Sequence, residues 1–369
     1  MVGRREPLNA LTTLRFFAAF RVMLYHAVAW DRQSFWLRGL MATPIGVSYF
    51  FVSSGFLLTY TYADRPIALR EFWTRRAERI LPVYYLGLVV AIPMLIATGG
   101  ISLGRVVATL ALVQAWNPRT ALYWNFPAWA LSALAFFYFA LPFALRITTR
   151  MSSRRILVLS AIVWALSVVS GLVYAWLRPD GLASVTLYTR ADWLNVLKFN
   201  PLLRLPEFLL GVCAGQLFRR WGGFGPRAVR IFSITVVALA AALLLVQLLP
   251  YPVANSGCMD PLLAIVLVCL ATDNAVTRFF SRPVFVRLGQ SSFCLYMVHA
   301  PLLSYAQALL PASWRHRPVY LLATIPTIVF IALALYTWIE APISAALRRR
   351  RSGAQRHRQQ TFAPGTRPP

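Results

Sequence analysis

The chain has 369 residues, of which 59% are hydrophobic and only 13% are charged. Soluble domains average about 45–50% apolar and about 25% charged residues, so the composition excludes an ordinary soluble domain and indicates an all-α polytopic membrane protein. The formal net charge of +26 would suggest nucleic acid in a soluble protein. Here the basic residues lie between apolar runs, so we expect a lipid bilayer and no nucleic acid as partner.

The first apolar run extends from Leu8 to Trp30 and has the length of a membrane span, yet it contains ionisable side chains. Such groups are costly in hydrocarbon and usually face a protein interior or a water-filled cavity. Arg15 and His26 are eleven residues apart, which places them within roughly 20° on one helix face and about 16 Å apart along the axis. A hydrogen-bonded histidine between helices is the structural alternative. Arg15 and Arg21 interrupt the run, which argues against a cleavable signal peptide.

Ten apolar runs have roughly the length of a membrane span. They are 10–30, 43–62, 80–97, 127–145, 156–177, 204–218, 231–249, 259–272, 291–310 and 319–345. A further run at 103–116 is short. If this run does not cross the membrane, 25 of the 37 Lys and Arg residues fall on one side of the membrane and 9 on the other. The remaining three, Arg15, Arg21 and Arg204, lie within apolar runs. The positive-inside rule then predicts about ten transmembrane helices, both termini in the cytoplasm, and a re-entrant or interfacial helix at 103–116.

The whole chain is expected to form one membrane domain with a short tail. We assign residues 1–347 to the transmembrane domain and residues 348–369 to a basic cytoplasmic tail. The tail begins with four arginines and ends in Pro, Gly and Thr, a composition typical of disorder and suited to the anionic inner leaflet. On this topology Arg15 lies in the cytoplasmic half of the first helix and His26 in the outer half.

The four cysteines, Cys213, Cys258, Cys269 and Cys294, show no pair with metal-ligand spacing. We therefore predict neither a disulfide framework nor a metal site.

Several segments resemble, in the same order, the motifs of the membrane acyltransferase-3 family. LTTLRFFAAF…LYH at 11–26 resembles the family's first helix, which carries an Arg, ten intervening residues and a His. YFFVSSGFLLTY at 49–60 resembles the second helix, and FWTRRAERILPVYYL at 72–86 resembles the arginine-rich loop that follows it. The remaining similar segments are PLLRLPEFLLGVCAGQ at 201–216 and the stretches around His299 and Glu340.

This resemblance implies an integral-membrane O-acyltransferase of the cytoplasmic (inner) membrane. Its substrates would be a cytosolic acyl-CoA, with acetyl as the expected acyl group, and a hydroxyl on an envelope glycan or a glycosylated small molecule. Acyl-CoA would act as a co-substrate, and we expect no tightly bound cofactor. Many members carry an additional soluble hydrolase-like domain after the last span; none is expected here.

The resemblance also implies roles for residues of the first helix and of the arginine-rich loop. His26 would act as general base or, alternatively, as the nucleophile that carries the acyl group. Arg15 would act with it, by holding donor phosphates or polarising the thioester carbonyl. Arg75, Arg76 and Arg79 would bind the phosphates of the donor, because guanidinium groups bind phosphate through paired hydrogen bonds. An ordinary basic loop is the alternative for these three.

Weaker candidates for the pocket come from the other motifs. They are Ser54, Ser132, Tyr138, Glu207 and His299. Two further carboxylates are interpreted as structural. Asp260 precedes Pro261 and is expected to cap a helix, and Glu340 precedes Ala341-Pro342 and is expected to end one.

One departure from the family pattern concerns the fourth helix. It reads WALSALAFFYFALP at 129–142, with Leu134 where the family usually has Glu. A glutamate could orient or neutralise a buried Arg or imidazolium, and leucine does neither. A catalytically degenerate member that binds acyl-CoA or a glycolipid without turnover is therefore the alternative function. A carrier for a glycan or lipid ranks below it, because no inverted repeat supports one.

Overall fold

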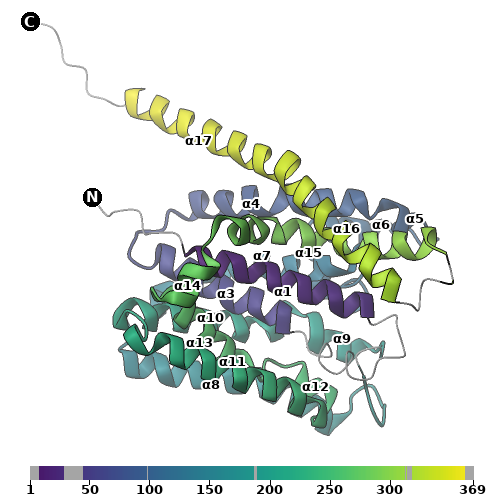
Figure 1. The fold of residues 1–369 in the computed structure, drawn as a ribbon, viewed down its shortest axis with the longest axis horizontal. Coiled ribbons are helices and arrows are strands. Elements are labelled where there is room, and N and C mark those ends of the chain that lie inside the picture. The colour runs from purple at the N-terminus through teal and green to yellow at the C-terminus, as the bar shows by residue number, and fades with distance from the viewer. Residues whose placement is uncertain are drawn as a thin grey trace, which may run out of the picture.

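The computed structural model describes part of the chain, and all regular elements in that part are helices (Figure 1). The described residues are 8–28, 45–97, 99–186, 189–311, 313 and 318–361, with the backbone alone described at 247 and 352–361. Residues 1–7 of the predicted domain, the loop at 31–42 and the end of the predicted tail at 362–369 lie outside them.

Long helices packed side by side make up most of the fold. They are α1 (Asn9–Val28), α3 (Ile45–Tyr62), α4 (Leu69–Val90), α7 (Trp129–Thr148), α8 (Ser153–Leu177), α10 (Pro201–Trp221), α11 (Ala228–Leu245), α13 (Asp260–Ala271), α15 (Pro283–Leu309) and α16 (Pro318–Leu335). The last of these continues through a π-helical turn, Tyr336–Glu340, into α17 (Ala341–Thr361). Each apolar run of the sequence coincides with at least part of one of these helices.

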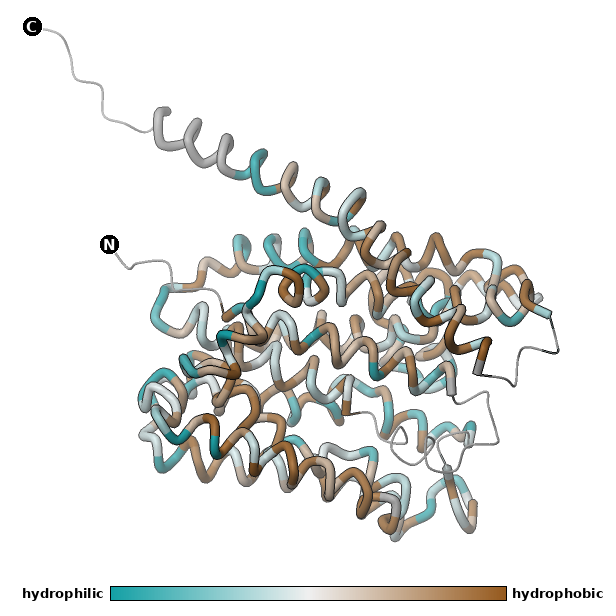
Figure 2. Tube along the Cα trace, in the orientation of Figure 1, coloured by the Kyte–Doolittle hydropathy of each residue, from teal (hydrophilic) through white to brown (hydrophobic). Residues whose placement is uncertain are grey.

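Four of the described helical segments are long and apolar enough to cross a membrane. They are Phe126–Thr148, Ser153–Leu177, Gly225–Leu245 and Val319–Arg351. A shorter apolar helix covers Asp260–Ala271. Figure 2 shows that hydrophobic residues occupy the middle of the bundle, whereas hydrophilic ones gather at the helix ends. This distribution is the one a bilayer requires of the helices that it surrounds.

The two ends of the bundle carry different elements (Figure 1). The end at which α1 and α4 begin and from which α17 extends also holds α14 (Ala275–Phe280). The opposite end holds α5 (Ile92–Ala97), α6 (Leu103–Leu110), α9 (Asp192–Phe199) and α12 (Tyr251–Ala254). Among the described residues, the basic segments 63–79, 146–155, 219–230 and 273–290 fall at the first of these ends (Figure 1).

The short run at 103–116 forms α6 and a 3-10 turn, Gln114–Trp116. An eight-residue helix is about 12 Å long, far short of the roughly 30 Å of a hydrocarbon core. Two tyrosines of α4 hold it: the hydroxyl of Tyr84 donates to the carbonyl of Thr109 over 2.5 Å, and that of Tyr85 to the carbonyl of Leu110 over 3.1 Å. The run is therefore a surface element in this structure and not a long helix.

Two regions differ from the sequence-based expectation. Arg75, Arg76 and Arg79 lie within α4, which begins at Leu69, and not in a loop; an ion pair between Glu71 and Arg75 one turn apart supports that helix. The predicted tail from Arg348 on continues as a helix to Thr361. Its many arginines and glutamines favour a helix, and an ion pair between Arg351 and Glu78 attaches it to α4.

Glycines allow two helix pairs to touch backbone to backbone. A Cβ added to Gly211 of α10 would lie 1.9 Å from the carbonyl oxygen of Val52, and one on Gly55 of α3 would lie 2.1 Å from that of Phe208. Gly289 of α15 meets α1 in the same way, with 2.2 Å to the carbonyl oxygen of Thr12. The small pair Ser54-Gly55 thus acts in packing through its glycine, as small residues do between membrane helices.

Replacing Gly211 with alanine is expected to force α10 away from α3 and to lower thermal stability, since overpacking costs about 1–3 kcal/mol. Thermal unfolding of the purified protein in detergent measures the change. Gly104→Ala in α6 is the matched control, because a Cβ there meets no atom within 4 Å. Equal melting temperatures for the two variants would contradict the close crossing.

Candidate functional site

A cavity of about 650 Å³ opens at the end of the bundle where α1 and α4 begin and α17 leaves. Its size is within the usual range for small-molecule sites. Most of the site residues predicted from the sequence line it: Arg15, Ser54, Arg75, Arg76, Arg79 and Tyr138. The structure thus brings together side chains from α1, α3, α4 and α7. We call this space the arginine cavity.

Positive charge exceeds negative charge in the arginine cavity. Among the described residues, the charged side chains that line it are Arg15, Arg75, Arg76, Arg79, Arg348, Arg351, Glu78 and Glu340. The positive charges of Arg79 and Arg76 repel the positive charge of Arg15. A concave surface with this excess favours a ligand carrying several negative charges, and guanidinium groups bind phosphates particularly well.

Some guanidinium nitrogens of the cavity arginines make no hydrogen bond within the described structure. The Nε atoms of Arg15, Arg75 and Arg76 are buried and have no hydrogen-bond partner there. Buried donors are normally satisfied, and exceptions are informative about ligands or function. These three donors are therefore not matched by acceptors within the described residues.

Glu340 lies in this cavity and does not end a helix, contrary to the sequence-based interpretation. The π-helical turn Tyr336–Glu340 is continuous with α17, and such turns are frequent at functional sites. The thiol of Cys294 donates to Oε2 of Glu340 over 3.2 Å. The turn therefore places the carboxylate of Glu340 beside Cys294 of α15, in the wall of the arginine cavity.

Leu134, which stands where the family usually has Glu, also lines the arginine cavity. The substitution thus removes a carboxylate from the wall of this cavity. Tyr138, one helical turn further along α7, lines the same space.

A pair of histidines forms the second part of the site. Nδ1 of His26 lies 2.9 Å from Nε2 of His299, and the two rings are stacked with centroids 5.1 Å apart. Nδ1 of His299 lies 3.2 Å from the carbonyl oxygen of Leu295. A carbonyl only accepts, so this nitrogen carries the hydrogen and Nε2 of His299 is an acceptor. His26 then donates from Nδ1, and its Nε2 keeps a lone pair.

The histidine pair and the arginine cavity occupy different positions along α1. Neither histidine is among the described residues that line the cavity, and eleven residues of helix separate Arg15 from His26, or roughly 16 Å. A row of aromatic rings extends from the arginine cavity to the histidine pair. Phe50 lines the cavity and contacts Tyr296 at 5.5 Å between centroids, and Tyr296 lies 5.9 Å from the ring of His299.

Ser132 lies outside the arginine cavity and acts in packing. Its hydroxyl donates to the carbonyl of Leu112 over 2.6 Å and accepts from the backbone nitrogen of Ala115 at 3.4 Å. It therefore holds the segment after α6 against α7.

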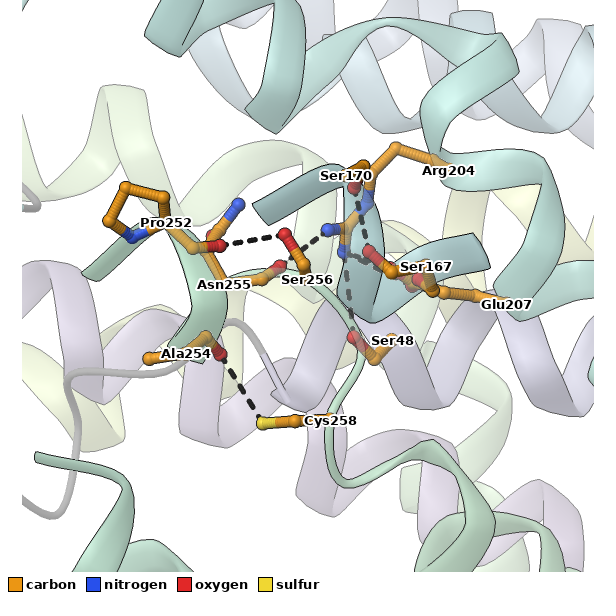
Figure 3. A network of polar contacts seen from close by, with 10 residues as sticks. All are labelled: Ser48, Ser167, Ser170, Arg204, Glu207, Pro252, Ala254, Asn255, Ser256 and Cys258. Atoms are coloured by element: carbon orange, nitrogen blue, oxygen red, sulfur yellow. Dashed lines mark hydrogen bonds and ion pairs between the residues drawn. The ribbon is translucent and has the colours of Figure 1, made fainter. Parts of the chain in front are cut away.

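Glu207 also lies outside the arginine cavity, in a buried polar network (Figure 3). Its Oε1 is 2.9 Å from Nη2 of Arg204, and both side chains are at most 2% exposed. Arg204 also donates to the carbonyl of Asn255 over 2.8 Å and to the hydroxyl of Ser48 over 3.4 Å. The network joins α3, α10 and the segment after α12.

Asp260 is the second carboxylate of this network and does not cap its helix. It is the first residue of α13, which has no side-chain cap at its start. The side chain is buried, and its charge acts on those of Glu207 and Arg204. The sequence missed this association because the two carboxylates are far apart along the chain.

A family model described as an acyltransferase domain matches residues 8–337. The chain belongs to the acyltransferase-3 family. It is therefore an enzyme that transfers acyl groups other than aminoacyl groups, and the members of its family are membrane proteins.

Curated relatives agree with this membership. The chain is 27% identical over 383 residues to acyltransferase MdmB of Streptomyces mycarofaciens, covering 95% of each chain. It is 29% identical over 339 residues to exopolysaccharide production protein ExoZ of Rhizobium meliloti (strain 1021), covering 89% of this chain and 96% of that one. A relative from Staphylococcus aureus (strain COL), whose name contains the term O-acetyltransferase, is 25% identical over 368 residues; the chain spans 56% of its length. No solved structure matches the chain.

Replacing Arg204 with methionine is expected to destabilise this acyltransferase strongly. The change leaves Glu207 and Asp260 buried without their cation, and breaking a buried ion pair costs about 3–5 kcal/mol. Thermal unfolding in detergent measures the effect. Arg119→Met is the matched control, because the ion pair of Arg119 with Asp192 has side chains 74% and 47% exposed and should contribute little. Similar unfolding of the two variants would contradict the structural role of the buried pair.

Proposed function

We propose that the protein is an O-acyltransferase that moves an acyl group, expected to be acetyl, from acyl-CoA to a hydroxyl of a carbohydrate-containing acceptor. The observation that carries the proposal is the placement of two unlike sites on one helix. The arginine cavity lies at one end of α1 and an activated histidine at the other. A donor with phosphates at one end and a reactive thioester at the other fits this arrangement.

The proposed orientation puts the arginine cavity at the cytoplasmic face of the inner membrane. The basic loops of the sequence lie at the end of the bundle where the cavity opens, as the positive-inside rule requires. In this arrangement about ten helices cross the bilayer and both termini lie in the cytoplasm. Acyl-CoA, a cytosolic compound, would then reach the arginines directly.

Binding of the donor would use the cationic side chains of α1 and α4. The phosphates of acyl-CoA would lie among Arg75, Arg76 and Arg79, which can offer paired hydrogen bonds. The extended arm of the donor would run along α1 past Arg15, over a distance of roughly 16 Å. The thioester would then approach His26.

The transfer step uses the lone pair on Nε2 of His26. This nitrogen takes the proton of the acceptor hydroxyl while the oxygen attacks the thioester carbonyl. The tetrahedral intermediate then collapses, the carbon–sulfur bond breaks, and His26 returns the proton to the departing thiolate. His299 holds His26 in the productive tautomer, as a hydrogen-bonded partner does for other catalytic histidines. The same lone pair also suits His26 as the nucleophile of an acyl-imidazole route.

The acceptor class rests on the relatives. ExoZ is named for exopolysaccharide production, which supports a carbohydrate acceptor. A glycosylated small molecule offers the same chemistry, a sugar hydroxyl. His26 lies at the end of α1 away from the arginine cavity, so the acceptor would approach from the outer side.

His26→Gln is expected to lower acyl-CoA turnover by about 10²–10⁴-fold, the usual contribution of a positioned base. His299→Gln should lower it less, by about 10- to 100-fold, because His299 only orients His26. The measurement is release of free CoA by membrane vesicles that contain matched amounts of each protein, with a polysaccharide acceptor present. Unchanged turnover in His26→Gln would remove this residue from the mechanism. An acyl group trapped on His26 would favour the nucleophilic route.

The second candidate function, a binder without turnover, rests on Leu134 in the wall of the arginine cavity. It predicts that the natural protein binds acyl-CoA and releases no CoA, whereas Leu134→Glu gains turnover because the carboxylate pairs with a cavity arginine. The enzyme proposal predicts turnover in the natural protein. The vesicle assay with Leu134→Gln as an uncharged control separates the two.

A further inference from the structure

Helix α17 forms one wall of the arginine cavity although it lies beyond the part of the chain that the family model matches. The model ends at residue 337, and the cavity is lined from α17 by Ala341, Ser344, Leu347, Arg348 and Arg351. These positions repeat at intervals of three or four residues, so they share one face of the helix. Helix α17 therefore presents a single face to the cavity.

Of the four arginines at 348–351, two belong to that face and two do not. Arg348 and Arg351 line the cavity, whereas Arg349 and Arg350 are not among its described lining residues; Arg348, Arg349 and Arg350 are all exposed, and Arg351 is half-buried. Arg351 forms an ion pair with Glu78 of α4, and the two side chains are 22% and 24% exposed. The charges of Arg75 and Arg76 repel that of Arg351, and the charge of Glu71 attracts it. The ion pair thus holds Arg351 beside two other arginines of α4.

We propose that α17 is part of the donor site, where Arg348 and Arg351 bind phosphate groups of acyl-CoA. Glu78 holds Arg351 in place until a phosphate takes over that contact. The inference rests on the proposed function and extends it to a segment outside the family model.

The charge around Arg351 favours a phosphate over a purely structural contact. The carboxylates of Glu78 and Glu71 attract Arg351 while Arg75 and Arg76 repel it, and the cavity as a whole is lined by more arginines than carboxylates. A phosphate monoester carries up to two negative charges and three acceptor oxygens, so it can serve arginines from α4 and α17 at once. The headgroup of an anionic lipid is the other source of the same chemistry, and the experiment separates the two.

The test measures binding of CoA to the purified full-length protein in nanodiscs of zwitterionic lipid. Arg348→Gln and Arg351→Gln are each expected to weaken binding about fivefold to tenfold, as loss of a charge-assisted hydrogen bond does. Arg349→Gln and Arg350→Gln are the matched controls and should bind as the natural protein does. Dephospho-CoA, which lacks one phosphate, should bind more weakly than CoA to the natural protein, and the difference should shrink in the cavity variants.

Glu78→Gln distinguishes a phosphate contact from simple anchoring of α17. If Arg351 binds phosphate, removal of the competing carboxylate should tighten CoA binding, whereas Arg351→Gln weakens it. If the ion pair only anchors the helix, both variants should weaken binding together. Effects of the same sign would therefore overturn the proposal. Should Arg351→Gln fail to fold, Arg348→Gln and Glu78→Gln still give the comparison.

Further measurements distinguish binding of lipid headgroups from binding of CoA, and failure of this inference from failure of the proposed function. If Arg348→Gln and Arg351→Gln weaken CoA binding only in nanodiscs that contain anionic lipid, the arginines bind headgroups and the proposal is wrong. If the natural protein consumes acyl-CoA and both variants keep its KM, the proposal is also wrong while the proposed function stands. If the natural protein neither binds CoA nor consumes acyl-CoA, the proposed function fails and this inference fails with it.

Discussion

Repulsion among guanidinium groups is the constraint on which the arrangement of α1, α4 and α17 depends. Arg15, Arg76 and Arg79 oppose one another within the cavity wall, and such repulsion grows as water is excluded. The carboxylates of Glu71 and Glu78 each offset one arginine but leave an excess of positive charge. An anion that binds there relieves the excess, so its binding free energy also stabilises the fold.

In the buried network of Arg204, carboxylates of the protein itself offset the positive charge. Its guanidinium group is matched within the protein by Glu207, Ser48 and the carbonyl of Asn255, and Asp260 adds a second carboxylate nearby. This leaves no excess of positive charge for an external anion. The Arg204 network and the arginine cavity thus contain similar residues but differ in charge. Carboxylates offset the arginine in the network, whereas the cavity is open and keeps an excess of positive charge.

The sequence predicted the parts of the site that depend on helical periodicity and local motifs. Arg15 was predicted as a catalytic residue and Arg75, Arg76 and Arg79 as donor-binding residues, and the structure places all four around one cavity; their roles stay predictions. The apolar runs coincide with helices because each run is long enough to satisfy its own backbone hydrogen bonds. These features can be predicted without knowing which helices pack against each other.

The contacts that the sequence did not reveal are those between distant segments. His26 meets His299 across 273 residues, and Glu207, one helical turn from Arg204 in α10, is brought near Asp260 of α13 by helix packing. Residues from 348 on read as disordered because their composition is polar, whereas an ion pair with Glu78 attaches this segment to α4. Glu340 read as a helix end because a proline follows two residues later, yet the helix continues through a π-helical turn.

The packing of α15 on α1 connects the two parts of the site mechanically. Gly289 of α15 touches the backbone of α1 at Thr12, and both residues line the arginine cavity. Further along the same pair of helices, His299 contacts His26. Both helices run in the same direction between these two contacts, so a shift of α15 at the cavity also moves His299 relative to His26. Interiors packed this closely transmit strain, so under the proposed mechanism occupation of the cavity would be coupled to the orientation of His26.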